Sequence, residues 1–242
     1  MLDALSTTPG AEIRRRLGDL GVKVSVLDPL IRGVPGTPQP EAVEERMRWL
    51  FVPTQEECWR AAEAVGAPAI NFTQFLGEAA GRDAVFAGLR AMAEANRAEG
   101  FASTIEFIPG TAVPDLPAGA ELTAGAGHFT ILFDTWHYAR SGGTLEQIAA
   151  LPARAIGAVQ VNDWTAPEPG APYVPMSGRL APGAGSLPLR EILRLIEANS
   201  PGLIVGIEVF NADLAGVDFG AAAQRLAAAS APFLATPHEQ KP

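Results

Sequence analysis

Short apolar runs rich in β-branched residues recur along the chain, and a longer segment with helical periodicity separates each run from the next. Such alternation is typical of a parallel sheet, because parallel strands need a crossover connection that is usually a helix. It therefore predicts an α/β fold. The predicted strands lie at residues 22–29, 68–74, 103–109, 129–137, 156–163 and 203–210.

The segments between these runs are rich in Ala, Leu, Arg and Glu. Thr54 and Thr144 each precede acidic residues, as N-cap residues do, and Gly66 and Gly100 fit as helix stops. We therefore expect helices at residues 11–21, 41–50, 54–66, 82–100, 143–151, 186–199 and 219–234.

The alternation fits either an open doubly wound sheet or a closed barrel. No G-x-G-x-x-G or Walker loop follows any predicted strand, which argues against a nucleotide-binding doubly wound fold. Polar residues instead end several different strands, where a barrel gathers its active site. This pattern favours a TIM (β/α)8-type barrel. The strand-end residues are Asp28, Asn71, Glu106, Asp134, Gln160, Asp163 and Glu208.

Only about six strands can be counted, and residues 11–21 look like the helix that would follow a second strand. We therefore expect the first βαβ unit of the barrel to be lacking. The strand edges exposed in this way could pair with another chain, so a homodimer is one expected outcome.

The chain has 242 residues, of which 48% are hydrophobic, and no shift in composition marks a boundary. A single barrel of this length is usual, so we expect one domain over residues 1–242, with a frayed tail at 236–242. The Pro- and Gly-rich stretch 164–185 is long for a connection and is expected to form a functional loop.

Acidic residues outnumber basic ones by 27 to 18, for a formal net charge of −9. Such a surface repels phosphate backbones and anionic membranes, so we expect neither a nucleic-acid nor a membrane partner. There is no signal-peptide pattern and no apolar run long enough to span a bilayer. Cys58 is the one cysteine, which excludes an intramolecular disulfide. A cytoplasmic protein is the expectation.

Four polar residues interrupt apolar strands that should be buried on both faces. Burying an unpaired carboxylate costs several kcal/mol, and a bound metal is one of the few ways to offset this cost. Carboxylate and amide oxygens suit Mg²⁺ or Mn²⁺ best and tolerate Co²⁺ or Zn²⁺. We therefore expect one divalent metal ion at Glu106, Asp134, Gln160 and Glu208.

Four other residues are candidates for the same site. His137 follows Asp134 by three residues, and this spacing favours a functional role over a buried structural histidine. Trp136 could be a core aromatic or a pocket wall, and Arg179 could bind an anionic substrate group or lie on the surface. Asn71, at a strand end, is a candidate for substrate binding.

Several segments together resemble the xylose-isomerase-like TIM-barrel family of sugar phosphate isomerases and epimerases. This family also includes inosose dehydratases, 3-dehydroshikimate dehydratases and, more distantly, endonuclease IV. The resemblance covers nearly the whole chain and is most specific in the segments DTWH and IEVF. The other segments are LDPL, IEFIPGTAV, ILFDTWHYARSGGT, VQVND, GRLAPGAGSLPL and GIEVFNADL.

The resemblance implies that Glu106, Asp134, Gln160 and Glu208 bind one divalent metal. The epimerase branch more often has His as the third ligand, and some dehydratases share the Gln that stands at position 160. With a keto-sugar chelated by the metal, Glu106 and Glu208 would exchange a proton with the carbon next to the carbonyl. His137 would handle a hydroxyl proton, or protonate the leaving hydroxide in a dehydratase.

The leading hypothesis is a metal-dependent sugar (phosphate) or polyol isomerase/epimerase in carbohydrate metabolism. The alternative is a dehydratase (lyase) that acts on a cyclic keto-acid or inosose with the same scaffold. An endonuclease IV-type enzyme would need more histidines than the three present. A non-catalytic sugar-binding protein would be expected to lose part of the ligand set, which is complete here.

Overall fold

The computed structural model describes residues 7–78, 81–166 and 178–234. The chain divides into two compact units: the first unit is residues 1–132 and the second unit is residues 133–242. The expected single domain therefore stays a prediction. The tail at 236–242 and residues 167–177 of the expected loop lie outside the described residues.

The first unit is built on parallel strands. β1 pairs with β2, β2 with β3, and β3 with β4, and all three pairs are parallel. The last two residues of β4, Phe133 and Asp134, belong to the second unit. The bounds are β1 (Leu27–Leu30), β2 (Ala69–Thr73), β3 (Ala102–Glu106) and β4 (Phe129–Asp134).

Apolar side chains of these strands form the core of the first unit. Ile70, Phe72 and Ile105 are fully buried, and Phe129 is nearly so. The rings of Phe72 and Phe129 meet edge to face, with centroids 5.7 Å apart. The strands thus read as near-continuous apolar runs because helices cover the sheet.

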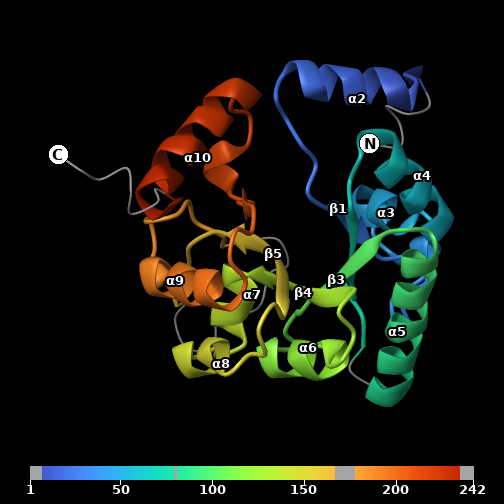
Figure 1. Ribbon diagram of the computed structural model, residues 1–242. Helices are drawn as coiled ribbons and strands as arrows, with labels where there is room; N and C mark the ends of the chain where they lie inside the picture. The colour runs from blue at the N-terminus through green and yellow to red at the C-terminus, as the bar shows by residue number, and fades with distance from the viewer. Residues whose placement is uncertain (1–6, 79–80, 167–177, 235–242) are drawn as a thin grey trace. The chain divides into compact units, whose positions relative to one another are not determined.

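Helices of the first unit pack on this sheet. α4 contacts β1 and β2, α5 contacts β3, and α2 lies against α4 (Figure 1). The helices expected at 54–66 and 82–100 are confirmed, including the capping box at Thr54. The bounds are α2 (Gly10–Asp19), α3 (Glu45–Arg48), α4 (Gln55–Val65), α5 (Arg82–Ala98) and α6 (Leu116–Thr123).

The single helix expected at 41–50 was wrong. Val43 is extended, so the segment divides into the short 3₁₀ helices η1 (Pro40–Ala42) and η2 (Trp49–Phe51) on either side of α3. α6 was not expected at all. It begins at Asp115, whose side chain accepts a hydrogen bond from the backbone N–H of Ala118 at 2.9 Å.

The second unit continues the pattern. β5 and β6 are parallel, with Gln160 opposite Gly206. α7 contacts β5, α8 contacts α9, and α10 contacts both α9 and β6. The bounds are α7 (Thr135–Arg140), α8 (Leu145–Ala149), β5 (Ile156–Val161), α9 (Leu189–Asn199), β6 (Val205–Ile207), η3 (Ala212–Leu214) and α10 (Phe219–Leu234).

Three expected strands were clearly too long, and the run at 203–210 is strand only over Val205–Ile207. The run at 129–137 stops being a strand at Asp134, because the Asp134 side chain accepts the backbone N–H groups that begin α7. The run at 22–29 becomes strand only from Leu27, the first residue that pairs with β2. Val22 is 48% exposed, so the start of that run gains little from extended pairing.

Six strands follow one another in sheet order as they do in sequence. This order confirms the expected α/β barrel-type fold, with fewer than eight strands among the described residues. No helix in the described part of the chain combines the length and hydrophobicity of a membrane span.

Asp163 ties down the segment that carries Arg179. Its Oδ1 accepts backbone N–H groups of Trp164 and Leu187 at 2.8 and 3.0 Å, and its Oδ2 accepts that of Gly183 at 3.0 Å. Asp163 and Leu180 also exchange two backbone hydrogen bonds as an antiparallel bridge. The 1%-exposed carboxylate therefore fixes the chain directly after Arg179.

We expect Asp163→Ala to lower the free energy of unfolding by roughly 3 kcal/mol, because it leaves three partly buried N–H groups without their acceptor. The matched control is Asp115→Ala, which removes one helix cap and should cost about 1 kcal/mol. Urea unfolding of both variants measures the difference. Equal costs would show that Asp163 is an ordinary cap.

Candidate active site

Asp134 is a fully buried carboxylate at the junction of β4 and α7. Its Oδ1 accepts the backbone N–H groups of Trp136 and His137, both at 2.8 Å. Its Oδ2 accepts Asn162 Nδ2 at 2.9 Å and lies 3.5 Å from Arg179 Nη2. The helix cap thus holds one oxygen and directs the other toward Asn162 and Arg179.

Arg179 lies at the centre of the polar cluster in the second unit. Its side chain is 4% exposed, and its Nη2 lies 3.0 Å from Glu208 Oε2. The same nitrogen lies 3.3 Å from His137 Nε2. Because a guanidinium only donates, this last contact requires the lone pair of His137 Nε2.

Aromatic rings hold the Arg179 guanidinium in place. The guanidinium carbon lies 4.5 Å from the centre of the Trp136 ring and 5.3 Å from that of Phe210. Trp136 is 1% exposed, and its ring meets that of His137 edge to face at 5.0 Å. Trp136 is therefore a buried aromatic that packs against the polar cluster, and its expected contact with substrate stays a prediction.

Glu208 follows β6 directly and is the more accessible carboxylate. Its backbone N–H donates to Val161 O at 3.2 Å, and its Oε1 accepts Gln160 Nε2 at 3.5 Å. The Glu208 side chain is 24% exposed, whereas that of Asp134 is 0% exposed. Only Glu208 of this pair can meet a molecule that arrives from solvent.

Three atoms with lone pairs therefore lie around one nitrogen atom of Arg179 in the second unit. Asp134 Oδ2, His137 Nε2 and Glu208 Oε2 all lie within 3.0–3.5 Å of one nitrogen atom of Arg179. Two carboxylates and an imidazole around a cationic group are also the donor types that bind a divalent metal. Asp134 and His137 each offer a ligand atom within 4.8 Å of the other, so these two residues of the second unit fit such an ion.

Burial lowers the pKa of His137 to about 4, and the Arg179 and Arg140 cations act in the same direction, against the opposite effect of the Asp134 carboxylate. His137 is therefore neutral at neutral pH. A neutral imidazole can accept a hydrogen bond or bind a metal, but it has no proton to give as an acid.

Glu106 lies in the first unit, at the end of β3, and is 7% exposed. Its Oε2 accepts a hydrogen bond from Thr73 Oγ1 at 3.4 Å. In the β3–β4 register Glu106 lies opposite Leu132, and Asp134 is two residues farther along β4. Glu106 is thus a buried strand-end carboxylate that could supply one metal ligand.

The amide of Asn71 is engaged on both sides within the first unit. Its Nδ2 donates to Asp28 Oδ1 at 2.7 Å and to Thr73 Oγ1 at 3.1 Å. Its Oδ1 accepts Thr104 Oγ1 at 2.7 Å. Asn71 therefore links three strands, and its expected role in substrate binding stays a prediction.

Sequence reasoning missed two features of this site. It did not expect Arg179 to contact Asp134, His137 and Glu208, because no pattern links Arg179 to residues more than 25 positions away. It also assigned no role to Asn162. The structure shows Asn162 bonded to Asp134 and Thr135, and the strand-end pair Asn162-Asp163 was the available signal.

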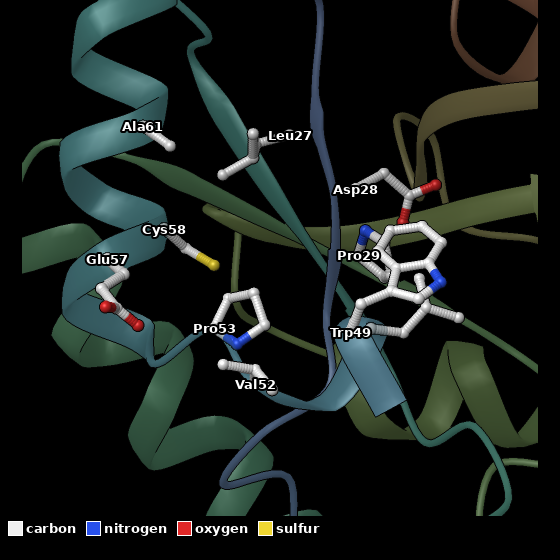
Figure 2. Close-up of a pocket in the computed structure, with 10 residues that line it drawn as sticks. Leu27, Asp28, Pro29, Trp49, Val52, Pro53, Glu57, Cys58 and Ala61 are labelled. Atoms are coloured by element: carbon white, nitrogen blue, oxygen red, sulfur yellow. The ribbon is translucent and has the colours of Figure 1, made fainter. Parts of the chain in front are cut away.

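A pocket lies in the first unit, between β1 and α4. This pocket of about 440 Å³ contains the chain's one cysteine, and Figure 2 shows the Cys58 sulfur directed toward Pro53. Burial, with help from the Glu57 charge, raises the pKa of the Cys58 thiol to about 11. The thiol is thus protonated at neutral pH and is no nucleophile.

We expect the stability of the metal-free protein to fall between about pH 6.5 and pH 4 because of His137. An unfolded histidine takes up a proton below about pH 6.5, whereas folded His137 stays neutral until about pH 4. The unfolded state therefore binds more protons in this window, which lowers the unfolding free energy by up to roughly 3 kcal/mol at its acid end.

Thermal or urea unfolding in EDTA from pH 4 to pH 7.5 measures this slope. His137→Gln should flatten it, whereas the control His128→Gln, at a histidine paired with Glu94, should not. A slope that is the same in wild type and His137→Gln would contradict the expectation.

Solved structures with the same fold are similar to this chain over most of its length. The IolI protein, solved with a bound zinc atom, is 14% identical and covers 96% of this chain and 84% of its own, with a TM-score of 0.76. D-psicose 3-epimerase, solved in the presence of D-fructose, is 15% identical and covers 96% and 87%, with a TM-score of 0.66. AsbF from Bacillus anthracis, described as a probable 3-DHS dehydratase, is 15% identical and covers 91% of this chain and 79% of its own, with a TM-score of 0.65.

At these identities the likeness shows the fold alone. No protein of curated function matches the chain. The family model described as the xylose isomerase-like TIM barrel matches residues 2–236, nearly the whole chain. With its parallel strands in sequential order and polar residues at their carboxyl ends, the chain belongs to the xylose isomerase-like TIM barrel family.

Proposed function

We propose that this protein is a divalent-metal-dependent isomerase or epimerase of small keto-sugars, sugar phosphates or polyols. The observation that carries the proposal is the convergence of Asp134, His137 and Glu208 on one point in the second unit. Relatives of the same fold include an epimerase and a protein with bound zinc, which supports this interpretation.

The proposed metal ligands are Asp134 and Glu208, together with Gln160 and Glu106. Gln160 lies beside Glu208, with 3.5 Å between Nε2 and Oε1. Glu106 is proposed as a further ligand because its buried carboxylate ends a strand and would be stabilised by a cation.

This oxygen-rich set suits Mn²⁺ or Mg²⁺ best and accepts Co²⁺ or Zn²⁺. When bound, the ion would polarise a substrate carbonyl and make the neighbouring C–H more acidic. His137, which the lowered pKa keeps neutral, is available either as a further ligand or as the acceptor of a hydroxyl proton.

Proton transfer is assigned to the two glutamates. Glu208 is the better-supported base, because its side chain is 24% exposed and can meet a substrate, whereas the side chain of Asp134 is fully buried. Glu106 would return the proton to the substrate carbon. Arg179, Trp136 and Asn71 are proposed to position the substrate, with Arg179 as the group for a phosphate or carboxylate.

A dehydratase of a cyclic keto-acid or inosose is the second candidate. The observation in its favour is Gln160 at a position on β5 where the epimerases resembled by this sequence more often have His. The fold of AsbF is similar too. Against it, a dehydratase needs an acid for the leaving hydroxide, and His137 has no proton to give at neutral pH.

The remaining expectations stay proposals. The substrate would be a small molecule, with neither nucleic acid nor membrane as partner, and the protein would act in the cytoplasm. A homodimer would cover strand edges that a six-stranded sheet leaves unpaired.

We expect Glu208→Gln to weaken Mn²⁺ binding by at least roughly a hundredfold, since even outer-shell partners are commonly worth 10–100-fold. Isothermal titration calorimetry with EDTA-treated protein measures the affinity, and metal-dependent thermal shift gives a second readout. Glu191→Gln, an exposed glutamate of α9 in the same unit, is the control and should bind like wild type. Wild-type protein that binds none of Mn²⁺, Mg²⁺, Co²⁺ and Zn²⁺ would refute the metal site.

We expect wild-type protein loaded with Mn²⁺ to place solvent deuterium on a carbon of its keto-sugar substrate, with Glu208→Gln lowering kcat by roughly 10²–10⁴. D-fructose and a panel of related ketoses, followed by NMR in D₂O, provide the assay. An isomeric product supports the epimerase, and a product that has lost water supports the dehydratase. Turnover without exchange or cleavage at that C–H would contradict both.

A further inference from the structure

We propose that Arg179 competes with the metal: its guanidinium takes the metal's place in the metal-free protein and must leave before the ion can bind. This inference rests on the metal site of the proposed function. It concerns the order of events at that site, in which metal loading releases Arg179 from the ligands.

The contacts of Arg179 carry the inference. Its Nη2 lies 3.0 Å from Glu208 Oε2, 3.5 Å from Asp134 Oδ2 and 3.3 Å from His137 Nε2. A divalent metal would need the same carboxylate oxygens at about 2.0–2.6 Å. Two cations sharing these oxygens would lie within about 4 Å of each other, and their repulsion is strong in a buried site.

Charge favours the guanidinium at this point. Asp134 and Glu208 bring two negative charges together under a side chain that is 4% exposed. A buried carboxylate left without a cation costs several kcal/mol. Arg179 offsets part of that cost and so stabilises the metal-free protein.

The backbone at Arg179 and directly after it is held by hydrogen bonds, so the proposed movement belongs to the side chain. Arg179 O accepts Asn211 Nδ2 at 3.2 Å, and the next residue, Leu180, forms the bridge with Asp163. The guanidinium lies over the rings of Trp136 and Phe210, at 4.5 and 5.3 Å. A change of rotamer can carry it off these ring faces while the backbone stays in place.

The competition has a functional consequence. While Arg179 binds Asp134 and Glu208, it cannot bind an anionic group of a substrate. Metal binding frees the guanidinium, so an anionic substrate should bind after the metal and not before it. Metal affinity is in turn reduced by the free energy needed to displace Arg179.

The experiment compares Zn²⁺ and Mn²⁺ affinity in wild type, Arg179→Gln, Arg179→Lys and the control Arg190→Gln. Arg190 lies over the Phe233 ring in the same unit, so its loss removes the same charge without touching the carboxylates. We expect Arg179→Gln to bind either metal at least about tenfold more tightly than wild type in calorimetry, the equivalent of one charge-assisted contact. Arg179→Lys should show a smaller gain, and Arg190→Gln none.

Two further readouts do not depend on affinity. The melting temperature of metal-free Arg179→Gln should fall by on the order of 10 °C, while the metal-loaded variant should lose much less. Zn²⁺ should change the tryptophan emission of wild type, because the guanidinium leaves the Trp136 ring, and should change that of Arg179→Lys less. This measurement remains valid if Arg179→Gln does not fold.

The affinities distinguish failure of the Arg179 competition from failure of the metal site itself. Wild type that binds metal, with equal or weaker binding in both Arg179 variants, overturns the competition and leaves the proposed function standing. Metal binding to Arg179→Gln but not to wild type supports it in its strongest form. No binding to any of the four proteins overturns both the competition and the metal site.

Discussion

The buried carboxylate of Asp134 is the interaction on which the second unit depends. A charge at zero exposure is tolerated because backbone N–H groups, an amide and a guanidinium surround it. The same contacts end β4, begin α7 and set the ring of His137 beside Arg179. One side chain thus determines both the local secondary structure and the geometry of the polar cluster. A substitution of Asp134 would therefore alter the local fold as well as the site.

Much of the fold could be predicted from the sequence, because alternating strands and helices leave few topologies. Periodicity and caps predict the parallel strands and the long helices. These helices are α4, α5, α9 and α10. The extent of β4 was not. Periodicity treats Asp134 as one more residue of an apolar run, whereas its side chain ends the run by capping helix α7.

The candidate site was predictable in its residue types but not in its pairings. A carboxylate inside an apolar strand can be recognised from the sequence, because its burial without a partner is costly. This reasoning identified Asp134, Glu106 and Glu208. Arg179 lacks such a signal, since an arginine in a Gly- and Pro-rich segment looks exposed. That it is 4% exposed depends on contacts with Trp136 and Glu208, which only the tertiary fold creates.

The hydrogen bonds of Asp163 have a consequence for how such a protein can change over evolution. Asp163 and Trp164 precede the segment 165–178, while Leu180, Gly183 and Leu187 come after it, and a single carboxylate and one antiparallel bridge join the two sides. The backbone directly before and directly after that segment is therefore held by hydrogen bonds to a single residue, Asp163. A change in the length of that segment would leave the hydrogen bonds of Asp163 in place, so these anchors allow the segment to vary without loss of the bridge between Asp163 and Leu180.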